Sequence, residues 1–318
     1  MNDESMAVPA LAGRSVLVTG GSGFLGRHLA RRLAEGGARV EATWFRHPPA
    51  AELPAAIRWQ QADCRDLDTV RRLFDATRPE IVYHLCGAPN AARDLTLVHA
   101  LVASDLIPTL NVLVVAAERK VRRLITTASL EEPEPGEAPS SPYAAVKVCN
   151  AAHARMLHRL YQLPVVTLRP YMTYGPGQAE NKVVPYLVRH LLAGQPPELG
   201  DGERGVDWIY IDDVIDGFIA AATASGVEGQ TIDLGSGVLV PIRVVAEMLV
   251  ELTGATVQPR FGARPARPFE RVRVADVAAA ATHLHWRPRV PLRAGLARTV
   301  AWWAGTRGAA PKILERSE

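Results

Sequence analysis

Residues 20–26 read Gly-Gly-Ser-Gly-Phe-Leu-Gly and stand between the apolar residues 16–18 and a helix-like stretch at residues 27–35. The glycines therefore occupy a tight turn from a strand into a helix. A residue without a β-carbon lets the backbone approach a pyrophosphate closely, and the amide groups at the start of the helix favour its negative charge. The alternative is that these glycines only form a tight turn and bind no ligand. The strand and helix on either side make this alternative the weaker one. The stretch predicts that a dinucleotide binds at this turn.

Short β-branched runs alternate with helical stretches along the first half of the chain. Such alternation is typical of an α/β fold in which helices cover both faces of a doubly wound parallel sheet. Prolines interrupt the pattern beyond Tyr174, and we expect a smaller C-terminal lobe for the substrate. The expected strands are 15–19, 39–43, 57–60, 81–85, 124–127 and 165–168. The expected dinucleotide-binding domain covers 12–174 with a return segment near 206–234, and the expected substrate lobe covers 175–205 and 235–310.

Composition excludes several classes of protein. The net charge of +3 comes from scattered arginines rather than from a run, which argues against a nucleic-acid partner and suits a small anionic substrate. Cys64, Cys86 and Cys149 are odd in number and far apart, so neither a disulfide framework nor a metal site is expected. The first residues lack an apolar signal core, and the apolar run 110–117 is too short to span a bilayer. We therefore expect a cytoplasmic protein with no membrane partner.

Tyr143 and Lys147 lie four residues apart in an alanine-rich helical stretch that begins after Ser141. They are therefore neighbours on one helix face. Arginine is the usual cation in this chain, which has only four lysines, so a lysine here indicates a need for a compact charge. An ammonium group beside a phenol stabilises the phenolate and prepares it for proton transfer. The alternative is a solvated helix face without chemistry.

Further motifs follow in order along the chain. They are Asp63 after the third expected strand, His84-Leu85-Cys86-Gly87 after the fourth, then Ser129, Leu168-Arg169-Pro170, Tyr174-Gly175-Pro176-Gly177 and Trp208-Ile209-Tyr210-Ile211-Asp212-Asp213. Together with the glycine turn and the pair of Tyr143 and Lys147, they resemble the extended short-chain dehydrogenase/reductases. The resemblance is to the group of nucleotide-sugar epimerases, dehydratases and 4-ketoreductases, and it covers nearly the whole chain.

This resemblance implies a Rossmann-type fold, a homodimer and a catalytic trio. In the trio, Ser129 positions the reacting oxygen, Tyr143 passes the proton, and Lys147 holds the nicotinamide ribose and tunes Tyr143. The residues expected to bind the cofactor are Gly20, Gly23, Phe24, Leu25, Gly26, Arg46, Asp63, Cys64, Leu85, Gly87, Tyr143, Lys147 and Pro170.

Cofactor choice depends on the end of the second expected strand, where an acidic residue would bind the ribose hydroxyls of NAD. Trp44 stands about where that acid is expected, and Arg46 with His47 can receive the extra phosphate of NADP. NADP(H) is therefore favoured, while NAD(H) stays open, as does an exposed Arg46 that makes no contact. The resemblance assigns Asp63 to the adenine amino group rather than to the cap of the helix that starts near Asp66.

Several residues depart from the pattern of the family. Leu130 and Glu131 follow Ser129 where 4,6-dehydratases have an Asp-Glu pair, and without that aspartate the elimination of water is disfavoured. Glu131 either serves a variant elimination or decarboxylation, or is the first charge of an acidic loop at the mouth of the site. Asp105 stands where asparagine is common. Met172 and Val206 replace polar residues that meet the substrate diphosphate.

Lys182 and Arg271 match places where relatives hold the nucleotide diphosphate, and each is alternatively a surface charge. Three functions remain in competition. The first is NADPH-dependent reduction of a 4-keto nucleotide-diphosphate sugar. The second is an epimerase that retains NAD. The third is a catalytically silent dinucleotide-binding sensor.

Overall fold

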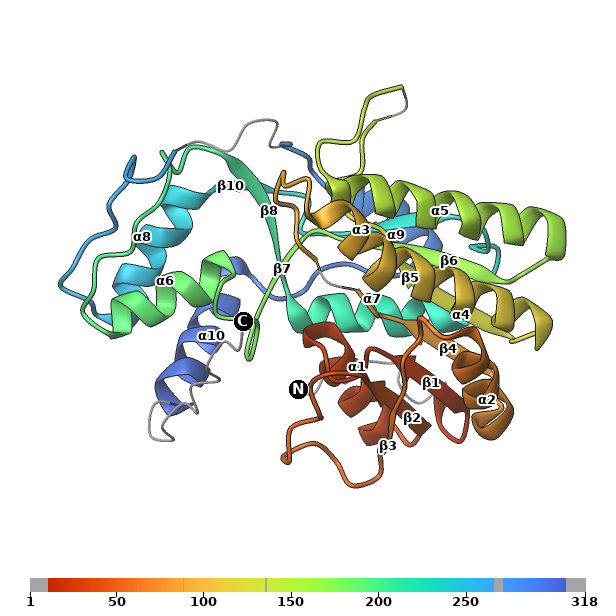
Figure 1. Ribbon diagram of the computed structural model, residues 1–318. Coiled ribbons are helices and arrows are strands. Elements are labelled where there is room, and N and C mark those ends of the chain that lie inside the picture. Colours follow the sequence, from red (N-terminus) through yellow and green to blue (C-terminus); the bar gives the residue numbers. More distant parts are fainter. Residues whose placement is uncertain (1–10, 88, 135, 266–270, 307–318) are drawn as a thin grey trace.

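The large sheet of this protein is parallel and has seven strands in the order β3-β2-β1-β4-β5-β6-β9. The computed structural model describes residues 11–87, 89–134, 136–265 and 271–306 (Figure 1). All six expected strands are present, with ends that differ from the expectation by at most two residues, and the doubly wound fold is confirmed. The strands are β1 (Ser15–Thr19), β2 (Arg39–Trp44), β3 (Arg58–Gln61), β4 (Ile81–His84), β5 (Arg123–Thr127), β6 (Val165–Pro170) and β9 (Thr231–Leu234).

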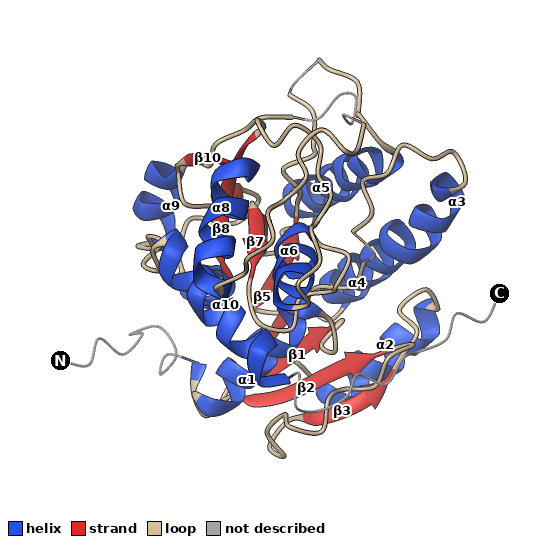
Figure 2. Cartoon of the chain, turned by 90° about the vertical axis from the view of Figure 1, so that its left-hand side faces the viewer, coloured by secondary structure: helices blue, strands red, loops and turns tan. Residues whose placement is uncertain are grey.

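Helices cover both faces of this sheet because successive side chains of each strand point to opposite faces. Val16 and Val18 of β1 pack with α1 (Phe24–Glu35) and α7 (Ile211–Thr223). Leu17, between them, packs on the other face. There it meets α2 (Leu67–Thr77), α4 (Ile107–Glu118) and α5 (Pro142–Tyr161), and Figure 2 shows helices on both sides of the strands.

The chain runs from β1 outward to β3 and then crosses back to β4, so the order of strands reverses between β1 and β4. Open α/β sheets bind ligands at the carboxyl ends of their strands, beside such a reversal. The glycine turn follows β1, and Gly87 and Ser129 follow β4 and β5. The topology therefore brings the motifs of the sequence to one edge.

A second, smaller sheet has the order β10-β8-β7 and lies beside the first, on the left in Figure 1. Its strands are β7 (Met172–Tyr174), β8 (Gly205–Tyr210) and β10 (Leu239–Pro241), and its helices are α6 (Val183–Leu192), α8 (Ile242–Thr253) and α10 (Leu292–Thr306). The segment 206–234 is shared, because β8 pairs in the small sheet whereas α7 and β9 belong to the large one. Helix α9 (Val277–Leu284) packs on β9 and α7.

The apolar run 110–117 belongs to a longer helical stretch than expected. α3 (Leu97–Leu101), a π-helical turn (Val102–Leu106) and α4 join into one stretch from Leu97 to Glu118. Among the described residues it is the one helix long and apolar enough to cross a membrane, with a mean hydropathy of 1.9. Inside the protein, 44% of this stretch is buried. It is therefore weak evidence for a membrane span, since the core helix of a soluble protein meets the same criteria.

Candidate active site

The glycine turn holds the end of β1 against the loop that follows β4. Gly20 has a φ of +72°, and a β-carbon there would lie 2.7 Å from the carbonyl of Leu85. A β-carbon on Gly26 would collide with the carbonyl oxygen of Gly20. α1 begins at Phe24 with Gly23 as its N-cap, without a capping side chain and without an acidic residue in its first turn. The positive end of the helix therefore faces the sheet edge uncapped by any side chain, as the binding of a pyrophosphate requires.

The loop that begins the small lobe closes over this turn. His28 of α1 lies with its Nε2 3.0 Å from the carbonyl oxygen of Pro176, and Arg27 donates to the carbonyl of Gly177. These contacts join α1, which covers the large sheet, to the loop that follows β7 of the small sheet. They position the sequence motif at 174–177 next to the predicted dinucleotide site.

Tyr143 lies in the first turn of α5, where the N-cap Ser141 accepts a hydrogen bond from Ala144 N at 3.1 Å. Lys147 is one turn further along, and its Nζ lies 5.6 Å from the centre of the Tyr143 ring. Lys147 is buried and also donates to Thr127 Oγ1 at 3.4 Å, at the end of β5. The pair therefore faces inward to the sheet edge and is not a solvated helix face.

Ser129 follows β5 and is buried beside Tyr143. Burial raises the pKa of Tyr143, whereas the charge of Lys147 and a hydrogen bond with Ser129 lower it. The three side chains that the sequence proposes as a catalytic trio thus meet in one place.

A fourth side chain, that of Asp105, reaches the same place from the π-helical turn. Its Oδ2 lies 3.2 Å from Lys147 Nζ, and its Oδ1 accepts from Asn150 Nδ2 at 2.7 Å. Gly87 makes room for it, since a β-carbon there would lie 2.5 Å from Oδ2. In the sequence, Asp105 stands out only as a departure from an expected asparagine, and nothing local indicates its contact with Lys147.

The acidic loop contributes Glu132 to the site. Glu132 is buried, accepts from Ser129 N at 3.0 Å and pairs with Arg169 at 3.1 Å. Arg169 also pairs with Asp233 of β9 at 2.7 Å. Glu131 is half-buried and donates its backbone N–H to Ser129 Oγ at 3.2 Å. Sequence reasoning missed Glu132, although the arginine at the end of a buried strand signals the need for a buried carboxylate.

At the end of β2, Arg46 is exposed and lies over the ring of Phe45, 5.6 Å from its centre. Arg65 covers the same ring at 4.8 Å and pairs with Asp63 at 2.7 Å, and its hydrogen bonds lower the pKa of that carboxyl group. The two arginines and Asp63 therefore cluster beside the ends of β2 and β3. Asp66, not Asp63, caps α2 by accepting from Thr69 N at 3.0 Å.

Cys64 and Cys86 are far apart in the sequence but lie close together in the structure. The loops after β3 and β4 bring their Sγ atoms to 3.9 Å, although both thiols are free. Leu85 and Gly87 flank Cys86, and Pro170 ends β6. Among the described residues, no group of three His, Cys, Asp or Glu side chains could hold a metal ion.

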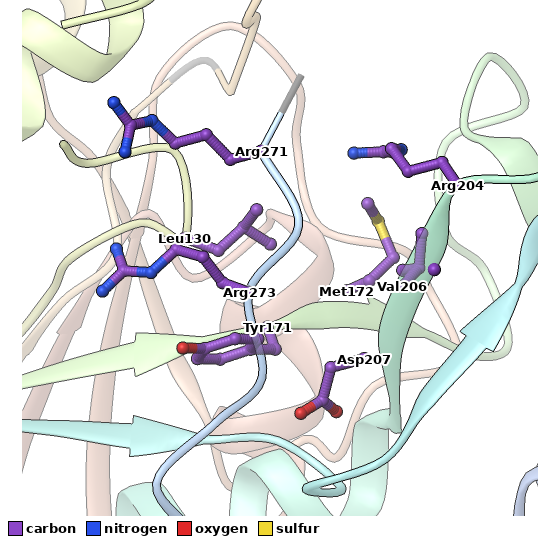
Figure 3. A pocket seen from close by; sticks show the side chains of 9 residues that line it. Leu130, Tyr171, Met172, Arg204, Val206, Asp207, Arg271 and Arg273 are labelled. Atoms are coloured by element: carbon purple, nitrogen blue, oxygen red, sulfur yellow. The ribbon is translucent and has the colours of Figure 1, made fainter. Parts of the chain in front are cut away.

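A pocket opens between the end of β6 and the small lobe (Figure 3). Arg271 lines this pocket and donates to Glu137 at 2.6 Å. Lys182 does not line it, and donates instead to the carbonyl of Pro89 at 3.0 Å. The structure thus does not bring Lys182 and Arg271 together at this pocket. The other residues that line it include Leu130, Met172, Arg204, Val206 and Arg273.

Arg204 and Arg273 are the pocket cations that sequence reasoning did not assign. Arg273 donates to the carbonyl of Glu132 at 3.0 Å and pairs with Glu134 at 2.9 Å. Figure 3 shows Arg271 and Arg273 extending to the same side, away from Arg204, which lies just before β8. Three arginines thus line the pocket together with one carboxylate, and two of them already pair with glutamates.

Comparisons with known proteins agree with this geometry. The model of the NAD dependent epimerase/dehydratase family matches residues 16–235. UDP-glucose 4-epimerase of Mycolicibacterium smegmatis is 30% identical over 90% of this chain and 97% of its own length. dTDP-glucose 4,6-dehydratase of an Actinoplanes species is 29% identical over 92% of this chain and 98% of its own length.

Solved structures of epimerases are also similar to this chain. UDP-glucose 4-epimerase of Thermotoga maritima with UDP-glucose superposes with a TM-score of 0.85 at 26% identity, over 92% of this chain and 99% of that one. The complex of Thermus thermophilus UDP-glucose 4-epimerase with NAD superposes with a TM-score of 0.79 at 27% identity. This match covers 93% of the present chain and 99% of the Thermus chain.

Proposed function

Because the chain belongs to the NAD-dependent epimerase/dehydratase family, we propose that it reduces the keto group of a 4-keto nucleotide-diphosphate sugar. The observation that carries this proposal is the meeting of Ser129, Tyr143 and Lys147 at the sheet edge, next to the glycine turn. Proton transfer by Tyr143 and recognition of a dinucleotide are then available in one site.

The residues present fit a nicotinamide dinucleotide. The close approach of backbone at Gly20 and Gly26 and the uncapped start of α1 form the cradle for its pyrophosphate. The cluster of Arg46, Arg65 and Asp63 would hold the adenosine end. Lys147 would hold the nicotinamide ribose. When bound, the cofactor supplies the hydride.

In the proposed reaction, the keto oxygen of the sugar accepts hydrogen bonds from Ser129 and Tyr143. Tyr143 gives its proton to this oxygen as the carbon receives hydride, so the ketone becomes a secondary alcohol and the phenolate takes a proton from solvent. Lys147 stabilises the transient phenolate. Leu130 lines the pocket with an apolar side chain where 4,6-dehydration needs an acid, and the proposal therefore excludes that elimination.

The second candidate is a 4-epimerase, which the names of the relatives favour. The two candidates differ in what happens to added cofactor. We expect deuterium from a reduced cofactor labelled at its transferable position to enter the sugar, with one cofactor oxidised for each product. Epimerisation of a 4-hydroxy sugar without net oxidation of added cofactor would instead establish the epimerase. If the protein binds the cofactor but catalyses neither reaction with any UDP-, dTDP-, GDP- or CDP-sugar, it is a catalytically silent dinucleotide-binding sensor.

For the cofactor we propose NADPH, because Trp44 ends β2 and the exposed Arg46 and Arg65 lie beside it. The relative from Thermus thermophilus holds NAD, so this choice is a property to be measured. We expect NADPH to bind more tightly than NADH, and Arg46→Ala to narrow the preference by about 1 to 3 kcal/mol. The control Arg58→Ala removes an exposed arginine from the opposite end of β3 and should leave the preference unchanged. Equal affinities in the wild type, measured by fluorescence titration, would contradict NADPH use.

For the substrate we propose that Arg271, with Arg204 and Arg273 beside it, binds the diphosphate. Phosphate oxygens would then replace the carboxylates of Glu137 and Glu134 that these arginines contact. Calorimetry should show binding of at least one of UDP, dTDP, GDP and CDP. Arg271→Met should raise its Kd about tenfold or more, whereas Arg293→Met, which removes an exposed cation from α10, should not. Binding that is unaffected by Arg271→Met would contradict this placement, and Lys182→Met would then be the next variant.

A further inference from the structure

Asp105 and Lys147 form an ion pair that is shut off from water. Asp105 has 1% of its surface exposed and Lys147 has 4%. Lys147 Nζ lies 3.3 Å from Oδ1 and 3.2 Å from Oδ2, so the ammonium faces both carboxylate oxygens. Asn150, one turn beyond Lys147 on α5, donates to Oδ1 at 2.7 Å and fixes the carboxylate. The Lys147 Nζ of this pair lies 5.6 Å from the centre of the Tyr143 ring.

A neutral side chain would satisfy the same donors. An amide oxygen at this position could accept from both Lys147 and Asn150 without the desolvation of a second buried charge. The carboxylate therefore adds one thing that packing does not require, a negative charge next to the ammonium that faces Tyr143. That charge opposes the effect of Lys147 on the phenol.

Resting on the reduction proposed above, we propose that Asp105 is a positioning residue that holds the Lys147 ammonium and balances its charge, so that Tyr143 keeps its proton and acts as the acid of the reaction. An uncompensated lysine would favour the phenolate, which suits the abstraction of a proton from an alcohol. A compensated lysine suits the donation of a proton to a ketone. The ion pair thus biases the site toward reduction.

The groups that face Tyr143 come from three elements, and their signs agree with this role. Burial raises the pKa of Tyr143, and the charge of Lys147 on α5 lowers it. Asp105 from the π-helical turn raises it, Ser129 after β5 lowers it by a hydrogen bond, and Glu132 in the same loop raises it. The result is a pKa above the ordinary value.

Lys147 itself stays charged in this surrounding. Burial lowers the pKa of Lys147, but the charges of Tyr143, Asp105 and Glu132 outweigh burial and raise it. His84 of β4 also faces Lys147, and burial together with the lysine charge lowers the pKa of His84 to about 3, so this imidazole stays neutral. Lys147 therefore keeps its charge at neutral pH.

The test is a titration of Tyr143 in the free protein, without cofactor or substrate. The near-ultraviolet absorbance of tyrosinate is followed against pH, and the signal of the other tyrosines among the seven in the chain is removed by subtracting the matching Tyr143→Phe protein. Three backgrounds are compared, namely the wild type, Asp105→Asn and Glu118→Gln. Glu118→Gln is the matched control, because it converts one carboxylate to an amide on the same helical stretch, roughly 20 Å further along the axis.

We expect the midpoint of Tyr143 to fall by about one pH unit or more in Asp105→Asn and to stay in place in Glu118→Gln. An unchanged or higher midpoint in Asp105→Asn would overturn the inference. If Asp105→Asn does not fold, the titration midpoint of Tyr143 in the wild type is the test. A midpoint above about 10, the ordinary value for tyrosine, supports the inference, and one below it overturns it. A shifted midpoint in a protein that reduces no keto sugar would refute the reduction while leaving the charge balance established.

Discussion

At the scale of single residues, His84 shows how burial sets a charge. It ends β4 with Thr19 Oγ1 2.8 Å from Nδ1 and Thr109 Oγ1 3.1 Å from Nε2. Burial, with a smaller effect of the Lys147 charge, lowers the pKa of His84 to about 3 from its ordinary value of 6.5. The folded protein therefore holds this imidazole neutral, and below pH 6.5 only the unfolded chain binds the proton.

His84 should consequently make the protein less stable as the pH falls from 6.5 toward 3. Between about pH 7.5 and about pH 5, this single group should lower the free energy of unfolding by about 2 kcal/mol. His84→Gln should lack that part of the slope when urea unfolding is followed by circular dichroism. Equal slopes in the wild type and the variant would mean that His84 is protonated in the folded protein.

Sequence reasoning at this scale reached the residues whose partners are local. Tyr143 and Lys147 lie four apart on one helix, so their proximity follows from the helical repeat. Asp105 lies 42 residues from Lys147, and Glu132 lies 37 from Arg169. Such contacts depend on how α5 and the loop after β5 dock on the sheet, and no periodicity in the chain encodes them.

At the scale of elements, the turn from β1 to α1 depends on the absence of side chains. A β-carbon on Gly26 would collide with backbone atoms of Gly20 and Gly21, which cannot rotate away. Gly26→Ala should therefore shift the start of α1 and weaken dinucleotide binding about tenfold or more, with a loss of stability of about 1 to 3 kcal/mol.

Gly305→Ala is the matched control for Gly26→Ala. Gly305 lies in α10 with nothing within 4 Å of the added β-carbon, so alanine there should leave binding unchanged and stabilise the helix by up to about 1 kcal/mol. Both variants are compared by fluorescence titration with the cofactor and by thermal unfolding. Full cofactor affinity in Gly26→Ala would contradict the placement of the pyrophosphate at this turn.

The elements that the sequence predicts best are those with strong alternation, β1 to β6. The small sheet was not expected in detail, because β7 and β10 have three residues each and pair with β8 only after the lobe has folded. The helical stretch from Leu97 to Glu118 was underestimated, because Asp105 and Pro108 interrupt its apolar pattern. Its π-helical turn is what accommodates Asp105 in the site.

At the scale of the whole molecule, the outer faces of α4 and α5 carry exposed apolar side chains. Ile107 and Val114 lie two turns apart on α4, and Met156 and Leu160 lie one turn apart on α5. α4 and α5 pack against each other, so we propose that this surface is where a second copy of the chain binds.

Leu160→Glu should accordingly convert a dimer into a monomer without unfolding it, because a charge would be buried unpaired in the contact. Sedimentation velocity at several concentrations gives the measurement. Val238→Glu places the same charge on an exposed apolar residue of the small lobe and should leave the dimer intact. A wild-type protein that sediments as a monomer at all concentrations would contradict the proposed contact.

The most direct test of the account follows the oxidation of reduced nicotinamide cofactor by absorbance, with 4-keto nucleotide sugars as substrates and with wild-type and Tyr143→Phe proteins. We predict that the wild type oxidises one cofactor for each sugar reduced. Tyr143→Phe should bind the cofactor equally well but turn over more slowly by a factor on the order of 10² to 10⁴, the usual contribution of a positioned acid. Wild-type turnover by Tyr143→Phe, or no oxidation by the wild type with any of these sugars, would contradict the account.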